Sequence, residues 1–206
     1  MKHIIKNAEP ASFTTWKANN PAATYKEDLK RERNIKKALK RSLIDEQHYI
    51  CCYCECRITE STSHIEHFKP KGNPAYSHLQ LDYSNLFASC GKYRSGDIDE
   101  HCGHRKYDEY NVDLISPLES DCSTHFKYNL FGEIEHNNSK RGEKTINILN
   151  LNSALLKAQR QELIDYFLDL DDNELKKELI AHLDTTNTKY GEFYSMIEYL
   201  TTNKML

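Results

Sequence analysis

The chain has 206 residues, of which 29% are charged, so it is long enough for one domain with appendages or for two small ones. No apolar run approaches the ~18 residues that a membrane-spanning helix needs, and residues 1–6 lack the apolar stretch of a secretory signal. These features argue against a membrane protein and predict a cytoplasmic one.

The net charge of −3 argues against a nucleic-acid binder, but the charges are distributed unevenly. Residues 25–41 carry eight Lys or Arg and three Asp or Glu, whereas residues 153–206 carry six and ten. A basic front and an acidic back suit a polyanion on one side and a protein partner on the other. The alternative is that both segments are only solvated helix faces.

The first fifty residues predict an arm followed by a basic helix. Residues 1–24 are expected to be extended and then to turn, and Ile4–Ile5 could form a short strand. Trp16, the only tryptophan, is expected to anchor this arm on the core. From about Tyr25 to Gln47 the pattern is helical, with basic residues on the outer faces and four apolar residues close to one face: Leu29, Ile35, Leu39 and Leu43.

Residues 49–110 are expected to form a small catalytic module. Short strands are predicted at 63–67 and 83–88, and a helix is predicted to start near His101. Residues 69–80 are predicted to form a loop, because they contain two prolines, a glycine and an asparagine. The sequence contains no glycine-rich phosphate loop, internal repeat or low-complexity tract.

The remainder of the chain turns from a small hairpin to helices. Alternating residues at 126–130, followed by Gly132 and Ile134, predict the hairpin. Helices are predicted at 140–149, from a cap at Asn152–Ser153 through Leu170, through Leu175 to Leu183, and through Tyr190 to Leu200. The expected class is α+β, divided into an arm with the basic helix at 1–48, a nuclease module at 49–135 and a helical region at 136–206.

The seven cysteines indicate a metal site, because thiols stay reduced in the cytoplasm and most of these lie beside the histidine-rich stretch 63–68. Cys51 and Cys54 are spaced C-x-x-C, so two thiolates on a tight turn can bind one Zn²⁺. Cys90 and Cys102 are the expected partners. Four thiolates on one ion would connect the turn, a strand and the helix, and a module this small needs such a connection for stability.

The second cysteine pair lacks the C-x-x-C spacing of the first, because eleven residues separate Cys90 from Cys102. Cys52 and Cys56 offer other pairings with Cys54, and His101 could replace a thiolate. The remaining alternative is that all of these are buried free cysteines.

Phosphodiester hydrolysis needs an activated water, a cation on the scissile phosphate and a group that orients the base. His67 suits the general base, because a neutral imidazole can take a proton from water at cellular pH. Glu66 leaves a regular strand on the face opposite to His67, and so does His64. Spacing alone therefore does not assign the roles of these three residues.

Other candidates follow the strand. Asn85 could orient His67 by accepting a hydrogen bond from its Nδ1–H, which would leave Nε2 free to face water. His104, in the first turn of the predicted helix, could be a second ligand of the catalytic cation. Phosphate contact is the natural use of the basic residues near the site in sequence: Lys69, Lys71, Lys92, Arg94, Arg105 and Lys106.

At these residues the sequence resembles the cysteine-framed form of the HNH endonuclease superfamily, and within it the PtuB family of nuclease subunits from Septu anti-phage systems, some relatives of which accompany retrons. The resemblance is carried by four segments: Cys51–Glu55, Ser63–Lys71, Asn85–Cys90 and His101–Lys106. Residues 10–16 and 148–152 fit the same family, so the likeness covers most of the chain.

The resemblance implies a ββα-metal fold and nicking or cleavage of nucleic acid with one catalytic divalent cation, Mg²⁺ or Mn²⁺. By motif position, it implies that His67 is the general base, Glu66 the acidic metal ligand and Asn85 the central asparagine, with acid and base at an irregular strand end. His104 would be the second metal ligand. The sequence departs from the pattern at Gly103, where many relatives have asparagine directly after the last cysteine.

The family also implies a partner, a PtuA-like ATPase that controls the nuclease. DNA is the favoured substrate, and an RNA such as tRNA is the alternative with the same chemistry. A third interpretation is a zinc-stabilised adaptor without catalysis, against which the joint presence of His67, Glu66 and Asn85 argues.

Overall fold

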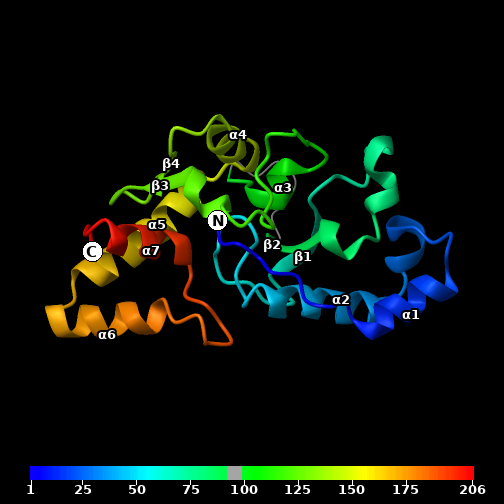
Figure 1. Cartoon of the computed structure of the whole chain (residues 1–206), viewed down its shortest axis with the longest axis horizontal. Coiled ribbons are helices and arrows are strands. Elements are labelled where there is room, and N and C mark those ends of the chain that lie inside the picture. The colour runs from blue at the N-terminus through cyan, green and yellow to red at the C-terminus, as the bar shows by residue number, and fades with distance from the viewer. Residues whose placement is uncertain (92–98) are drawn as a thin grey trace.

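The computed structural model describes residues 1–91 and 99–206 (Figure 1). A small two-stranded sheet and the short helix α3 lie in the middle of the molecule, with α1 and α2 on one side. The C-terminal helices α5, α6 and α7 lie at the opposite end. The mixture of helices and small sheets confirms the α+β class.

The N-terminal arm differs from the prediction. It contains a helix, α1 (Ala11–Asn19), and no strand at Ile4–Ile5. Phe13 is the only buried residue of α1, so this helix has no apolar periodicity that the sequence could reveal. Trp16 is only partly buried and stacks on Phe13.

The predicted basic helix is divided into two parts. Tyr25–Leu29 form a short π-helix, η1, and α2 follows at Arg33–Glu46. Leu29, Leu39 and Leu43 are fully buried, as their spacing predicts. Tyr25 and Leu29 of η1 and Leu39 and Leu43 of α2 belong to the same buried apolar cluster.

The central sheet pairs β1 (Ser63–His67) with β2 (Leu86–Cys90) in antiparallel register, from Ser63 opposite Cys90 to His67 opposite Leu86. The prediction of β1 is confirmed, whereas β2 begins three residues later than expected. Residues 83–85 form a 3-10 turn, η3, because the Asp82 side chain caps it by accepting from the Ser84 N–H. The loop between the strands contains a second 3-10 helix, η2 (Pro74–Leu79).

Beyond β2 the chain forms α3 (Cys102–Lys106), and both α3 and α2 contact β2. All five residues of β2 are buried. This strand therefore links the basic helix to the cysteine-bearing helix α3.

The C-terminal elements follow the prediction closely. A 3-10 turn, η4 (Cys122–His125), leads into the hairpin β3 (Phe126–Tyr128) and β4 (Ile134–His136). Helices α4 (Lys140–Leu149), α5 (Ala154–Leu168), α6 (Asp172–His182) and α7 (Tyr194–Thr202) come next. Ser153 caps α5 by accepting from the Leu156 N–H, as its position before the apolar run indicates.

One cluster of buried apolar side chains extends from the arm to α7, and the buried Glu55 ties its ends together. The Glu55 carboxylate lies 2.9 Å from the Met1 ammonium and accepts from the Ser195 N–H at 2.7 Å. The division at residues 48 and 135 stays a prediction. In the described parts of the chain, no helix is both long and apolar enough to cross a bilayer.

Candidate active site and cysteine cluster

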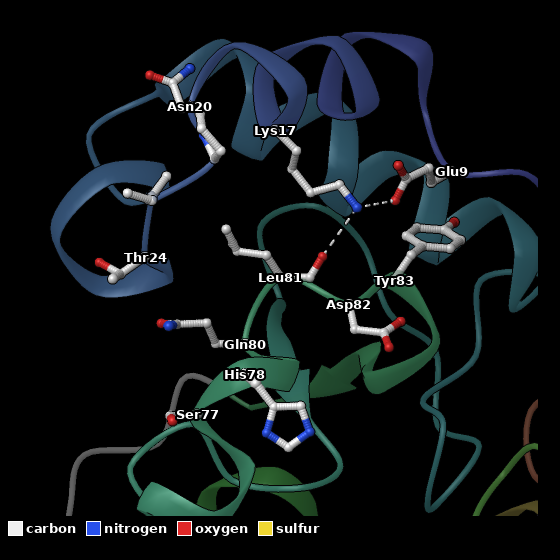
Figure 2. Close-up of a pocket in the computed structure, with 13 residues that line it drawn as sticks. Glu9, Lys17, Asn20, Thr24, Ser77, His78, Gln80, Leu81, Asp82 and Tyr83 are labelled. Carbon is white, nitrogen blue, oxygen red and sulfur yellow. Dashed lines mark hydrogen bonds and ion pairs between the residues drawn. The ribbon is translucent and has the colours of Figure 1, made fainter.

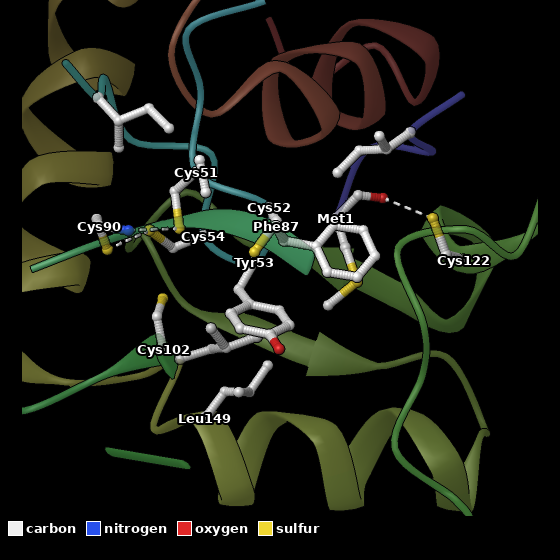
Figure 3. Close-up of a cluster of buried hydrophobic side chains, with 14 of the residues drawn as sticks. Met1, Cys51, Cys52, Tyr53, Cys54, Phe87, Cys90, Cys102, Cys122 and Leu149 are labelled. Carbon is white, nitrogen blue, oxygen red and sulfur yellow. Dashed lines mark hydrogen bonds between the residues drawn. The ribbon is translucent and has the colours of Figure 1, made fainter. Parts of the chain in front are cut away.

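Four cysteine thiols lie close together at the end of β2 that carries Cys90. The sulfur atoms of Cys51, Cys54, Cys90 and Cys102 all lie within 4.8 Å of one another, and all four residues are buried. Figure 3 shows these thiols gathered at one place, with Cys122 apart and beside Met1. The structure thus brings together the four predicted residues, and the group could hold a zinc ion.

Local backbone structure positions each sulfur. Residues 51–56 form a tight turn that is closed by the Cys51 N–H bond to the Cys56 carbonyl, 2.9 Å long. The Cys90 N–H donates to Cys51 Sγ at 3.3 Å, which orients this thiol toward β2. Cys102 opens α3 with a φ of +56°, so the chain turns sharply to aim its sulfur back at the turn.

The chemistry of the cluster calls for a cation. Burial penalises a thiolate at Cys102 and raises the pKa of its thiol well above the ordinary value. Burial disfavours the charged His101 ring, but the hydrogen bond and charge of Cys54, the Asp99 carbonyl and the charge of Cys51 together raise the pKa of His101. Zn²⁺ would compensate several thiolates at once in this apolar setting.

The alternative ligands are placed differently. Cys56 Sγ lies 3.3 Å from Cys54 Sγ but is only half-buried and outside the group of four. Cys52 is buried and also outside the group. Among the described residues, the other group with metal-ligand geometry is Glu119, Asp121 and His125, at the surface near η4.

A buried carboxylate lies on the face of β1 that meets α3. Glu66 Oε1 is 2.9 Å from Lys106 Nζ, and Glu66 Oε2 is 3.4 Å from His64 Nε2. The Tyr53 hydroxyl lies 3.4 Å from Oε1. Burial alone would raise the pKa of Glu66, but the His64 hydrogen bond and the Lys106 charge lower it to about 2. The carboxylate is therefore ionised at neutral pH.

Lys106 has a different role from the one expected. The sequence suggests a phosphate contact, but this ammonium is buried and also donates to the His67 carbonyl at 3.0 Å. It therefore balances the charge of Glu66 and holds the end of β1. Lys69, Lys71 and Arg105 lie on described segments, whereas Lys92 and Arg94 lie outside the described residues.

His67 is buried on the other side of the strand. Its Nε2 lies 3.1 Å from the Gln80 carbonyl, and its Nδ1 is buried with no hydrogen-bond partner among the described residues. This contact fixes Nε2 as the N–H nitrogen and leaves the Nδ1 lone pair as a proton acceptor. Burial and the charge of Lys71 lower the pKa of His67 to about 4, so the ring is neutral at cellular pH.

Asn85 forms no hydrogen bond with the His67 ring, in contrast to the prediction. Its side-chain oxygen accepts from the Lys69 N–H at 2.8 Å, and its amide donates to the Lys69 and Leu79 carbonyls. Asn85 instead closes both ends of the loop that carries the Gln80 carbonyl. The His67 ring is thus oriented by the Gln80 carbonyl, and Asn85 holds the loop that carries this carbonyl.

The resemblance implied an irregular strand end at Glu66 and His67, but β1 pairs regularly through both. The two side chains therefore leave on opposite faces, and Glu66 shares its face with His64. His104 lies next to this pair, with its ring 4.5 Å from the His64 ring, centroid to centroid. Its Nε2 faces the Gly91 carbonyl at 3.2 Å.

Gly103 lies directly against the side chains of Glu66 and His64. A Cβ atom at this position would lie 2.5 Å from Glu66 Oε2 and 2.7 Å from His64 Nε2. A side chain at residue 103 would thus enter the space that Glu66 and His64 occupy together.

Tyr25 is a site residue that sequence reasoning missed. Its ring packs edge-on against His67 with the centroids 4.5 Å apart, and its N–H donates to Gln80 Oε1 at 2.9 Å. No motif marks this residue, since 42 positions separate it from His67. The one available signal was an aromatic residue at the start of a basic segment.

No family model matches the sequence. Three curated proteins are similar to it. A protein named as the HNH endonuclease of retron Ec83 from Escherichia coli is 29% identical over 210 residues, covering 81% of this chain and 80% of that protein. A protein named as the HNH endonuclease of retron Vc95 from Vibrio cholerae is 32% identical, covering 65% and 66%. The Septu protein PtuB of Bacillus thuringiensis is 25% identical, covering 84% and 66%.

Proposed function

Because the chain belongs to the HNH endonuclease superfamily, we propose that it hydrolyses phosphodiester bonds of DNA in anti-phage defence. The observation that carries this proposal is that β1 bears two groups suited to this reaction at consecutive positions, one on each face of the strand. Glu66 is a buried, ionised carboxylate beside His64, and His67 next to it is a neutral imidazole with an unpartnered Nδ1. A purely structural zinc module has no need of either.

In this proposal β1, β2 and α3 form the ββα-metal core, and the four-cysteine group holds a structural zinc. The cluster joins the turn before β1, the end of β2 and the start of α3. Zinc would thereby fix the two elements that carry Glu66 and Lys106 relative to each other. The nuclease site depends on that placement.

Glu66 would hold the catalytic Mg²⁺ or Mn²⁺, which prefer carboxylate oxygen. When bound, such a cation neutralises charge on the scissile phosphate. His64 is the imidazole nearest to Glu66, whereas His104, the second ligand by motif position, has its Nε2 turned to Gly91. The geometry therefore supports His64 as a ligand, with His104 reaching the cation only if its ring turns.

His67 would act as the general base. Its Nδ1 takes a proton from the attacking water, the water oxygen forms a bond to phosphorus, and the bond from phosphorus to the leaving oxygen breaks. The Gln80 carbonyl accepts the hydrogen bond from Nε2–H and stabilises the positive ring that results. Lys106 keeps the carbonyl of His67 in place.

Replacing Gly103 with alanine tests the cation site. In a helix, alanine is favoured over glycine by about 0.8–1 kcal/mol, so the backbone tolerates the change. The new methyl group would crowd Glu66 and His64, and we expect cleavage to fall about 10–100-fold, with a higher Mg²⁺ or Mn²⁺ concentration needed for half-maximal rate. Zinc content and the melting temperature serve as controls. An unchanged metal requirement would contradict this cation site.

The partner in this proposal is a PtuA-like ATPase, by analogy with the Septu system to which the Bacillus thuringiensis relative belongs. RNA, including tRNA, is the alternative substrate, because the site chemistry does not depend on the 2′-hydroxyl. The zinc-stabilised adaptor is the alternative without catalysis.

The deciding experiment incubates the full chain, alone and with the ATPase, with DNA and RNA of matched sequence in Mg²⁺ or Mn²⁺. We expect cleavage of DNA that requires the divalent cation and whose rate changes when the ATPase is present. Cleavage of RNA but not of DNA would show that RNA, and not DNA, is the substrate. No cleavage under any of these conditions would favour the adaptor.

A further inference from the structure

In the basic segment 25–41, some Lys and Arg side chains have acidic partners among the described residues and others do not. Arg31 lies 3.5 Å from Glu27, and Arg41 and Lys37 both pair with Glu60. Lys40 donates to backbone carbonyls of Glu60 and Ser63. Lys36, in contrast, has no ion-pair partner within residues 1–91 and 99–206, so its charge is available to an external anion.

Lys36 and Lys71 gather around the ring of Tyr25. The ammonium of Lys71 lies 5.4 Å from the ring centroid, and that of Lys36 lies 5.9 Å from it. Lys71 also lacks an ion-pair partner among the described residues. Burial and the nearby charges of Lys30 and Lys71 lower the pKa of Lys36, which shows that these cations repel one another.

Tyr25 connects this pair of lysines to the general base. Its ring contacts His67, and its N–H holds Gln80, whose carbonyl in turn accepts from His67. The arm is also fastened by Lys17, which pairs with Glu9 and donates to the Leu81 carbonyl across a cavity of about 590 Å³ (Figure 2). Tyr25 itself is held in place by its N–H bond to Gln80 and by its ring contact with His67.

The Tyr25 hydroxyl is a free donor at this place. Burial and the charge of Glu66 raise the pKa of Tyr25 to about 12, so the phenol keeps its proton. The hydroxyl has no hydrogen-bond partner in the part of the chain that the structure describes. A neutral donor and two unpaired ammonium groups around one ring are complementary to an oxyanion.

We propose that Tyr25, Lys36 and Lys71 form a subsite for a backbone phosphate of the nucleic-acid substrate, beside His67. The inference rests on the proposed nuclease function and deepens it, because it names the groups that seat the strand against the base. A backbone phosphate fits this place because the Tyr25 ring packs directly against His67, where the strand to be cut would lie. Contacts to phosphate position the substrate without reading its sequence.

Binding of a fluorescently labelled DNA duplex tests the subsite without relying on cleavage. The anisotropy of the duplex is measured with the full chain over a series of salt concentrations, with no Mg²⁺ or Mn²⁺ added. For the double variant Lys36→Gln with Lys71→Gln we expect about tenfold weaker binding. The slope of log Kd against log salt concentration is expected to fall by roughly 0.9 for each phosphate that the variant no longer neutralises.

A matched control changes the net charge equally at other lysines. In the double variant Lys37→Gln with Lys157→Gln, each lysine replaced already has an acidic partner, Glu60 or Glu133. This control is expected to keep the wild-type slope within a few tenths. Tyr25→Phe retains the ring against His67 and is expected to weaken binding about tenfold, because it removes the hydroxyl donor.

The outcomes separate this subsite from the nuclease function itself. If the wild type cuts nucleic acid but the Lys36 and Lys71 variant binds like its control, the subsite is wrong and the nuclease assignment stands. If the wild type neither binds nor cuts nucleic acid, both proposals fail. An equal loss of affinity in both double variants would indicate a general charge effect and would also overturn the subsite.

Discussion

Replacing His67 with alanine is expected to lower the rate of nucleic-acid cleavage by about 10²–10⁴-fold, the range that a general base contributes. The reason is specific to Nδ1. This atom is the only buried nitrogen of the ring without a partner in the described structure, and Nε2 is committed to the Gln80 carbonyl. The measurement is the rate of duplex cleavage at saturating Mg²⁺ or Mn²⁺.

A second variant separates catalysis from folding, because alanine leaves a cavity at a residue that is only 4% exposed. His67→Gln can still donate to the Gln80 carbonyl through its amide but has no proton acceptor of suitable pKa. It should lose cleavage as completely as His67→Ala while keeping more of the thermal stability. His136→Ala, an exposed histidine on β4, is the matched control that should cleave normally. Full cleavage by both His67 variants would remove His67 as the base.

Substituting one zinc ligand is expected to have the largest effect on stability. Cys54→Ser and Cys102→Ser should each abolish stoichiometric zinc and lower the melting temperature by more than about 10 °C, since structural zinc contributes roughly 10–16 kcal/mol of apparent binding free energy. The reason is that the cluster joins three segments that lie far apart in the chain: the turn at residues 51–56, the end of β2 and the start of α3. Zinc is measured by elemental analysis of the purified protein.

The chain offers its own control in Cys122. This cysteine is also buried, but its thiol donates to the Met1 carbonyl at 3.3 Å and is not in the four-cysteine group. Cys122→Ser should keep one zinc per chain and lose only a small part of the stability. If Cys54→Ser or Cys102→Ser retained full zinc, one of the other thiols, or His101, would have to be a ligand.

The zinc-ligand variants and the His67 variants together test whether zinc binding and catalysis can be lost independently. Loss of zinc should remove cleavage indirectly, because Lys106 on α3 would no longer hold Glu66. Loss of the His67 imidazole should leave zinc content unchanged, because no atom of its ring is in the cysteine group. We therefore expect both kinds of variant to lose cleavage, the cysteine variants without zinc and the His67 variants with it.

Features that depend on neighbouring residues were predictable. The strand at 63–67, the hairpin at 126–136 and the helix at 140–149 follow from local alternation, periodicity and capping. The four cysteines were predictable from their ligand chemistry, even though eleven residues separate the last two. Helix α1 was not predictable, because it buries a single side chain and so leaves no apolar pattern.

Within the site, the sequence by itself determined the residue types: an imidazole, a carboxylate and a set of thiols in an order that resembles one superfamily. Only the tertiary structure decided which groups touch. It placed Lys106 against Glu66, assigned the Gln80 carbonyl to His67 in place of Asn85, and brought Tyr25 against the His67 ring. The physical reason is that a backbone carbonyl is common to every residue, and a contact between distant segments leaves no local pattern. Such contacts arise only when the chain packs.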